Sequence, residues 1–200
     1  MQTQGNNHFY INWAKERLDE MEAVLTSLES KVAEVQGDAR DKAKKALADL
    51  GKSRDIFRDT IKKQAEANEA AWTSAKEKLE PQWSSFETEV RKYVETFSRQ
   101  FEQQRATFKL QSAAQLKAWR EAADKLAGDT NQFAAERQAE IDTAVKRMQT
   151  DAAAAEVKLQ KQMEQMGTQS WSALMAVLTE TRAAFDRANQ AARDAFKRVA

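Results

Sequence analysis

The sequence predicts an all-α protein, and three observations carry this prediction. Glycine and proline are scarce, with five Gly and one Pro in 200 residues, so the chain can supply few tight turns. Good helix formers (Ala, Gln, Glu, Lys and Arg) dominate the composition. Aromatic residues recur in steps of eleven at Phe86, Phe97, Phe108 and Trp119. Because eleven residues complete three helical turns, this ladder stays on one face of a long amphipathic helix.

The first segment, residues 8–50, is expected to form a helix with a seven-residue repeat. Asn7 is a suitable N-cap for this helix. Steps of three and four place apolar residues on one seam, the pattern of a left-handed coiled coil: Leu18, Met21, Leu25, Leu28, Val32 and Val35. The segment either continues into the next helix or folds back as a third helix of a bundle.

Two long arms are expected after this segment, over residues 53–127 and 131–199. The strongest turn signal between them is Gly128-Asp129-Thr130-Asn131, where Gly128 can end one helix and Asp129 can cap the next. Each arm would be roughly 100 Å long, and the two would pack as an antiparallel hairpin. The alternative is one helix that runs through Gly128, because the ladder keeps its phase there.

The eleven-residue spacing of the ladder also indicates how the chain passes Gly51, Gly167 and Pro81. The ladder passes Gly51 and Gly167 without a shift, so both are expected inside helices at a cost of about 1 kcal/mol each relative to Ala. Pro81 lies between the in-phase Trp72 and Trp83. A kink or local break is expected there, because the proline ring clashes with the preceding helical turn.

The sequence offers no candidate catalytic, cofactor-binding or metal-binding residue. The chain has no Cys and a single His, and His8 is expected at the surface. No Gly-rich phosphate loop, nucleophile elbow or Glu-x-x-His pair is present. A net charge of +1 with both signs interleaved also argues against a nucleic-acid partner. We therefore expect neither an enzyme nor a nucleic-acid-binding protein.

The chain is expected to be a cytoplasmic protein without a membrane span. Its N-terminal residues are polar and contain no signal-peptide apolar region. The longest strongly apolar run is 173–178, far below the roughly 20 residues that cross a bilayer. The absence of Cys fits a reducing compartment.

A stripe of large apolar residues is the candidate interaction surface. Phe and Trp suit a tight two-stranded coil poorly, because such coils prefer Leu, Ile and Val at the seam. The stripe is therefore either the packing face of a looser multi-helix bundle or a face that lies on an apolar surface. It consists of Trp72, Trp83, Phe86, Phe97, Phe101, Phe108, Trp119, Ile141, Met163, Trp171, Leu174, Phe185 and Phe196.

The leading functional hypothesis is an elongated scaffolding protein that self-associates through the eleven-residue stripe as a homo-oligomer. The second is a coat protein for an apolar surface, lipid or granule. In the pattern of Phe86, Phe97, Phe108 and Trp119, the chain from about Ala46 onward resembles the eleven-residue-repeat helices of apolipoproteins. It likewise resembles phasins, the Ala/Gln-rich, cysteine-free proteins that cover bacterial polyester granules. It departs from apolipoproteins in having only Pro81 where those repeats carry regular prolines.

Overall fold

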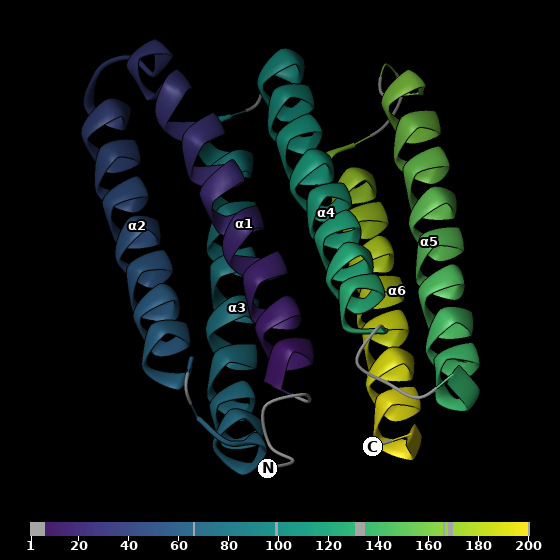
Figure 1. The fold of residues 1–200 in the computed structure, drawn as a ribbon. Helices are drawn as coiled ribbons and strands as arrows, with labels where there is room; N and C mark the ends of the chain where they lie inside the picture. The colour runs from purple at the N-terminus through teal and green to yellow at the C-terminus, as the bar shows by residue number, and fades with distance from the viewer. Residues whose placement is uncertain are drawn as a thin grey trace. The chain divides into compact units, whose positions relative to one another are not determined.

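The computed structural model describes residues 7–65, 67–98, 100–130, 135–165, 167 and 170–199, with 7, 101, 130, 135–137 and 199 described by their backbone alone. The predicted all-α class is confirmed, because the described residues form helices and no strand. In chain order the elements are α1 (Asn7–Lys31), the short 3-10 helix η1 (Val32–Glu34), α2 (Asp38–Gln64), α3 (Glu69–Phe97), α4 (Phe101–Thr130), α5 (Ala135–Glu164) and α6 (Trp171–Val199), as Figure 1 shows.

The helices form two compact units. Unit 1 combines Met1–Trp13 with Gln115–Ala200, and unit 2 is the continuous stretch Ala14–Ala114. The boundaries fall inside α1 and α4, so each of these helices supplies its first part to one unit and its second part to the other. The units are described separately below.

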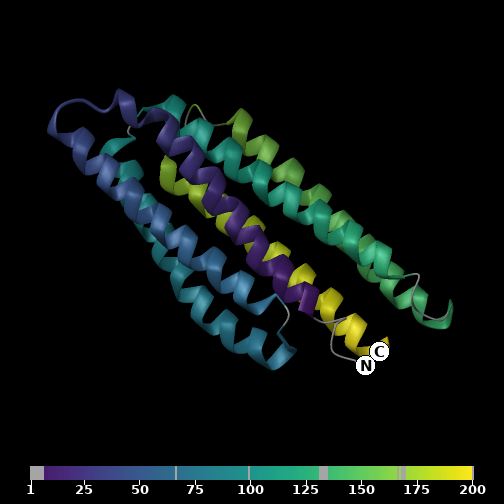
Figure 2. The ribbon, with the colours of Figure 1, turned by 60° about the vertical axis from the view of Figure 1, so that its left-hand side comes forward.

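Unit 2 contains α2 and α3, which lie side by side in both ribbon views (Figures 1 and 2). Gly37 adopts a φ of 61° at the start of α2, a left-handed conformation that favours glycine. The Arg40 side chain then donates to the Val35 and Ala33 carbonyls at 2.8 and 3.0 Å. These bonds satisfy carbonyls at the end of the preceding helical turn. At the start of α3, Asn68 Oδ1 accepts the Ala71 N–H at 3.0 Å, as an N-cap does.

The buried face of α3 follows the spacing seen in the sequence. The buried residues Trp72, Trp83 and Val94 are spaced eleven residues apart. Leu79 and Val90 are also buried and are separated by the same spacing. Other buried apolar residues of unit 2 are Met21, Val24, Leu25, Leu28, Ala43, Leu47, Leu50, Phe57 and Phe108. The apolar face of α3 is therefore buried rather than exposed.

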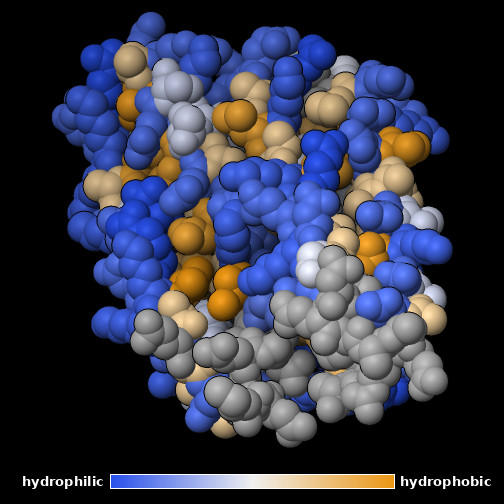
Figure 3. Space-filling view, viewed as in Figure 1, coloured by the Kyte–Doolittle hydropathy of each residue, from blue (hydrophilic) through white to orange (hydrophobic). Residues whose placement is uncertain are grey.

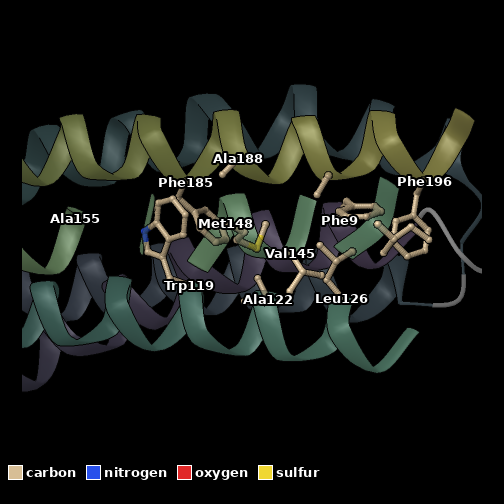
Figure 4. Packing of buried hydrophobic residues seen from close by; sticks show 13 residues of the cluster. Phe9, Trp119, Ala122, Leu126, Val145, Met148, Ala155, Phe185, Ala188 and Phe196 are labelled. Carbon is tan, nitrogen blue, oxygen red and sulfur yellow. The ribbon is translucent and has the colours of Figure 1, made fainter. Parts of the chain in front are cut away.

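Unit 1 is built from α5 and α6, which pack along each other, together with parts of α1 and α4. The core draws on every one of these segments (Figure 4): Phe9, Trp119, Ala122, Ala123, Leu126, Ile141, Val145, Met148, Ala155, Phe185, Ala188, Ala192 and Phe196. Many of these residues are alanines. A core of this composition lets helix backbones approach closely, but it buries less apolar area per residue than a leucine-rich core.

The observed helix boundaries differ from the expected segments. The segment 8–50 is divided at η1, and the arm 53–127 is divided between α2, α3 and α4. Gly51 lies inside α2 as expected, whereas Gly167 lies between α5 and α6, in 3-10 conformation rather than within an α-helix. These extra breaks let α3 pack along α2 and α6 along α5, so the shorter helices bury apolar faces against one another within one chain.

The expected turn after Gly128 and the kink at Pro81 have different outcomes. Helix α4 runs through Gly128 and Asp129 and ends at Thr130, and α5 begins at Ala135. The chain therefore leaves the helix close to the predicted turn, but Gly128 does not end α4 and Asp129 does not cap the next helix, and Asn131 lies outside the described residues. Pro81 stays inside α3, which continues to Phe97, and its side chain is exposed. Of the two expected outcomes, a kink or a local break, the local break was therefore wrong.

Candidate functional site

The residues of the predicted stripe lie in the interiors of both units. Those buried in unit 2 are Trp72, Trp83, Phe86 and Phe108, and those buried in unit 1 are Trp119, Ile141, Trp171, Leu174, Phe185 and Phe196. Phe97 and Met163 are half-buried. The side chain of Phe101 lies outside the described residues. The stripe is thus covered by other parts of the same chain rather than offered at the surface.

Aromatic rings contact one another edge to face in the core of unit 1. The rings of Trp119 and Phe185 meet with centroids 5.2 Å apart at 75°, and Phe9 meets Phe196 at 5.5 Å and 69°, as Figure 4 shows. These are favourable geometries for aromatic pairs. His8, expected at the surface, is buried, and its ring centroid lies 3.9 Å from that of Phe9. The expectation failed because α1 begins upstream of His8 and carries it into the core.

A group of buried polar residues in unit 1 was not predicted. Gln115 Nε2 donates to the Leu178 carbonyl at 2.9 Å, and the Thr181 hydroxyl donates to Gln115 Oε1. Asn189 Nδ2 donates to the Phe9 carbonyl at 2.8 Å. These bonds join α4 and α1 to α6. The sequence offers no signal that separates a buried Gln from an exposed one.

Unit 2 also contains buried polar side chains. The hydroxyl oxygens of Ser27 and Thr107 are 2.7 Å apart and join α1 to α4. Buried polar side chains elsewhere in the first half of α4 are Gln103, Gln111 and Ser112. A core with this many amides and hydroxyls specifies which helices pair, but each polar group replaces apolar contact area.

The face of the molecule seen in Figure 3 is predominantly hydrophilic. On the face seen in Figure 3, hydrophobic residues appear as small separate spots between hydrophilic ones. Among the residues that the structure describes, three large apolar side chains are exposed, namely Ile56, Leu110 and Val157. They come from three different helices. Single exposed apolar residues are normal on soluble proteins and do not by themselves mark an interface.

Three grooves run between neighbouring helices, each within one unit. One lies between α5 and α6, has a volume of about 340 Å³, and is lined by alanines that include Ala154 and Ala184. The second lies between α4 and α5, with about 330 Å³ and a lining that includes Ala123 and Ala152. Charged side chains frame both grooves, for example Arg187 in the first and Arg120 in the second. Small side chains at helix contacts leave this space because they do not reach the facing helix.

The third groove lies between α2 and α3 and has a volume of about 320 Å³. Tyr93 and Phe97 line it from α3, with ring centroids 5.1 Å apart. Burial raises the pKa of the Tyr93 phenol above its ordinary value of 10.0, because the phenolate loses hydration more severely than the neutral phenol. This groove is the one that combines aromatic walls with a buried titratable group.

The described part of the chain contains no group of three or more His, Cys, Asp and Glu placed to hold a metal ion. Within the same residues, no helix carries an apolar stretch long enough for a bilayer crossing. Comparison with protein-family models, curated proteins and solved structures gave no match.

Proposed function

We propose that this chain is a non-enzymatic structural protein of the cytoplasm whose amphipathic helices coat an apolar surface, either a lipid layer or a polyester granule. The observation that carries the proposal is the burial of the large apolar stripe inside units made of separate amphipathic helices. In such a bundle each helix keeps its charged face in water. An apolar surface can replace the neighbouring helices as the cover for the other face.

The composition of the two cores favours this exchange. Trp and Phe, which sit well at a boundary between water and an apolar phase, supply the largest buried side chains, including Trp72 and Trp119. Alanines and hydrogen-bonded amides occupy much of the rest, so the closed bundle gains less from apolar burial than a leucine core would. Opening the bundle therefore costs less free energy than opening a leucine-rich one, and contact with the apolar surface offsets this cost.

The connections between the helices also suit an opening of the bundle onto the surface. The breaks after Lys31, Gln64 and Phe97 separate helices of 25 to 30 residues, each roughly 37–45 Å long at 1.5 Å per residue. Helices of this length can lie flat on a surface one after another while the short connections act as hinges. Their side chains need not change rotamer for the stripe to turn outward.

The second candidate function is a scaffold that self-associates as a homo-oligomer. The observation that favours it is the pair of alanine-lined grooves that flank α5, with Val157 exposed at 65% on the same helix. Small residues let another helix approach closely. Sedimentation velocity over a range of concentrations tests this function, because a scaffold forms larger species as the concentration rises and a monomeric coat protein does not.

A disulfide lock tests the coat function. In the Ser27→Cys/Thr107→Cys variant, two sulfurs replace hydroxyl oxygens that lie 2.7 Å apart, which is close to the S–S bond length of about 2.05 Å. The chain has no other Cys, so oxidation closes this one bond and ties α1 to α4 within unit 2. The reduced form of the same variant is the matched control.

Contact with the surface is measured in a version of this variant that retains Trp83 as its only Trp, with Phe at the other four positions. Vesicles with brominated acyl chains quench Trp emission on contact, and aliphatic polyester particles are assayed by co-sedimentation. We expect the reduced protein to bind and Trp83 to be quenched, while oxidation abolishes the quenching. Absence of binding to both surfaces, or equal quenching in the two redox states, would overturn the proposal.

A further inference from the structure

Most buried polar residues of unit 2 come from α1 and α4. The hydroxyl oxygens of Ser27 and Thr107 lie 2.7 Å apart, so these two positions face each other where α1 meets α4. Gln103 and Gln111 lie four residues on either side of Thr107, a spacing that keeps them on the same side of α4. Both are buried, at 7% and 2% exposure. This side of α4 therefore carries a row of buried polar side chains.

The side of α1 that carries Ser27 also carries two buried carboxylates. Glu20 and Glu16 precede Ser27 by seven and eleven residues, which are spacings that return to one side of a helix. Both are 0% exposed, and Glu16 Oε2 accepts a hydrogen bond from Arg17 Nη1 at 3.0 Å. We call the two rows together the polar seam: Glu16, Glu20 and Ser27 on α1, with Gln103, Thr107 and Gln111 on α4.

The buried residues of α2 and α3 have the opposite character, because all of them are apolar or aromatic. They are Ala43, Leu47, Leu50 and Phe57 on α2, and Trp72, Ala75, Leu79, Trp83, Phe86, Val90, Tyr93 and Val94 on α3. The two helices pack along each other. Separating them exposes apolar area to water, and the free-energy cost grows with that area.

Separating the two sides of the polar seam costs less free energy. Amides, hydroxyls and carboxylates that become exposed gain hydrogen bonds to water, and these bonds offset the intramolecular ones that are lost. A buried ion pair adds little net stability for the same reason, because its charges give up their hydration on burial. Since α1 begins unit 2 and α4 ends it, the seam can part while α2 and α3 stay together.

We propose that unit 2 opens first along the polar seam, while α2 and α3 remain paired as one helical hairpin. The seam is then the line along which the bundle opens onto an apolar surface. The inference rests on the proposed coat function only for the purpose of the opening, because the opening itself is a property of the free protein.

Hydrogen exchange of the isotope-labelled full chain, measured without any surface, tests the order of opening. The reporters are amides of buried apolar residues, Leu25 in α1 and Phe108 in α4 against Leu47 in α2 and Val90 in α3. After correction for intrinsic rates, we expect the first two to exchange about tenfold faster, because a partial opening requires less free energy than global unfolding. Equal protection of all four amides, or weaker protection of Leu47 and Val90, would overturn the proposal.

Two variants place the opening at the seam. Leu50 lines the groove between α2 and α3, so Leu50→Val weakens a contact that the partly opened form keeps. It should speed exchange at Leu47 and Val90 about three- to fivefold, the effect of one methylene group, and leave Leu25 and Phe108 unchanged. Thr107→Val is the matched control, because the seam is broken in both the partial and the global opening. It should speed exchange at all four amides by the same factor, and a uniform response to Leu50→Val would contradict the proposed order.

Failure of this inference and failure of the coat function give different results. Binding to vesicles or polyester particles by a protein with uniform protection overturns the polar seam as the opening line and leaves the coat function standing. Preferential exchange of α1 and α4 in a protein that binds neither surface overturns the coat function and leaves the seam standing.

Discussion

The hydroxyl oxygens of Ser27 and Thr107 lie 2.7 Å apart in the interior of unit 2, although 80 residues separate them in the sequence. Thr107 also donates to the Gln103 carbonyl at 2.9 Å, so its single proton is committed and Ser27 is the donor between the two hydroxyls. This bond ties α1 to α4 inside unit 2.

Substitution of this pair should be non-additive. We expect Ser27→Ala and Thr107→Val each to lower the free energy of unfolding by about 1–2 kcal/mol, because each removes one partner of a buried hydrogen bond. The double variant should cost less than the sum, since no hydroxyl is left without its partner. Urea denaturation of the four proteins measures this coupling. Strict additivity would show that the two hydroxyls do not interact in solution.

The Trp119 side chain should be essential to the core of unit 1. It is 1% exposed and meets Phe185 edge to face, so Trp119→Ala is expected to lower the free energy of unfolding by about 3–5 kcal/mol. Val157→Ala, at a position 65% exposed, is the control and should change it by less than about 0.5 kcal/mol. Thermal unfolding monitored by circular dichroism compares them. Equal small effects would mean that Trp119 is not packed as described.

Pro81 should be a destabilising residue that the chain tolerates. It lies inside α3 without ending it, yet it has no N–H to donate to the carbonyl four residues earlier. Pro81→Ala restores this bond, and we expect the unfolding free energy to rise by about 1–3 kcal/mol. Ser85→Ala at a nearby exposed position controls for helix propensity alone and should gain no more than about 0.5 kcal/mol. A lower melting temperature for Pro81→Ala would contradict this account.

Tyr93 should make the chain less stable in alkali. Its folded-state pKa lies above the ordinary 10.0 because of burial. Above pH 10.0 the unfolded chain therefore releases a proton that the folded chain keeps, and the unfolding free energy falls as pH rises. In a Tyr10→Phe background, Tyr93→Phe should remove this dependence on Tyr ionisation. Phenolate absorbance of the folded background protein should appear only above pH 10.0, and its appearance at or below the ordinary pKa would refute the assignment.

The sequence predicted the helical class and the buried face of α3 well. Scarce Gly and Pro exclude other classes, and the spacing of Trp72, Trp83 and Val94 matches the buried positions. The ends of α2 and α3 were missed because no glycine or proline marks them. Asn68 alone caps α3, and Gln104 Nε2 contacts the Ser98 carbonyl at 3.1 Å where the chain turns into α4.

The eleven-residue spacing of the apolar residues continues unchanged across these breaks, so it gave no sign of them. Phe97 and Phe108 remain eleven residues apart although the helix is interrupted between them, so periodicity alone cannot distinguish one long helix from two that bury the same face. The sequence also could not predict what covers the stripe. An apolar helix face has the same residue pattern whether its own chain or a foreign surface covers it. The buried Gln115 and Thr181 depend on how α4 meets α6, which is a tertiary property.

The division of α1 between the two units has a consequence for synthesis on the ribosome. Unit 2 is one continuous stretch, Ala14–Ala114, whereas unit 1 joins Phe9 to Phe196 near the other end of the chain. At roughly 5–20 residues per second, the first turns of α1 wait roughly ten to forty seconds for α6 to be made. Until α6 has left the ribosome, Phe9 lacks the partner that it contacts in the finished unit. Unit 2 can therefore fold first during synthesis, and unit 1 closes later.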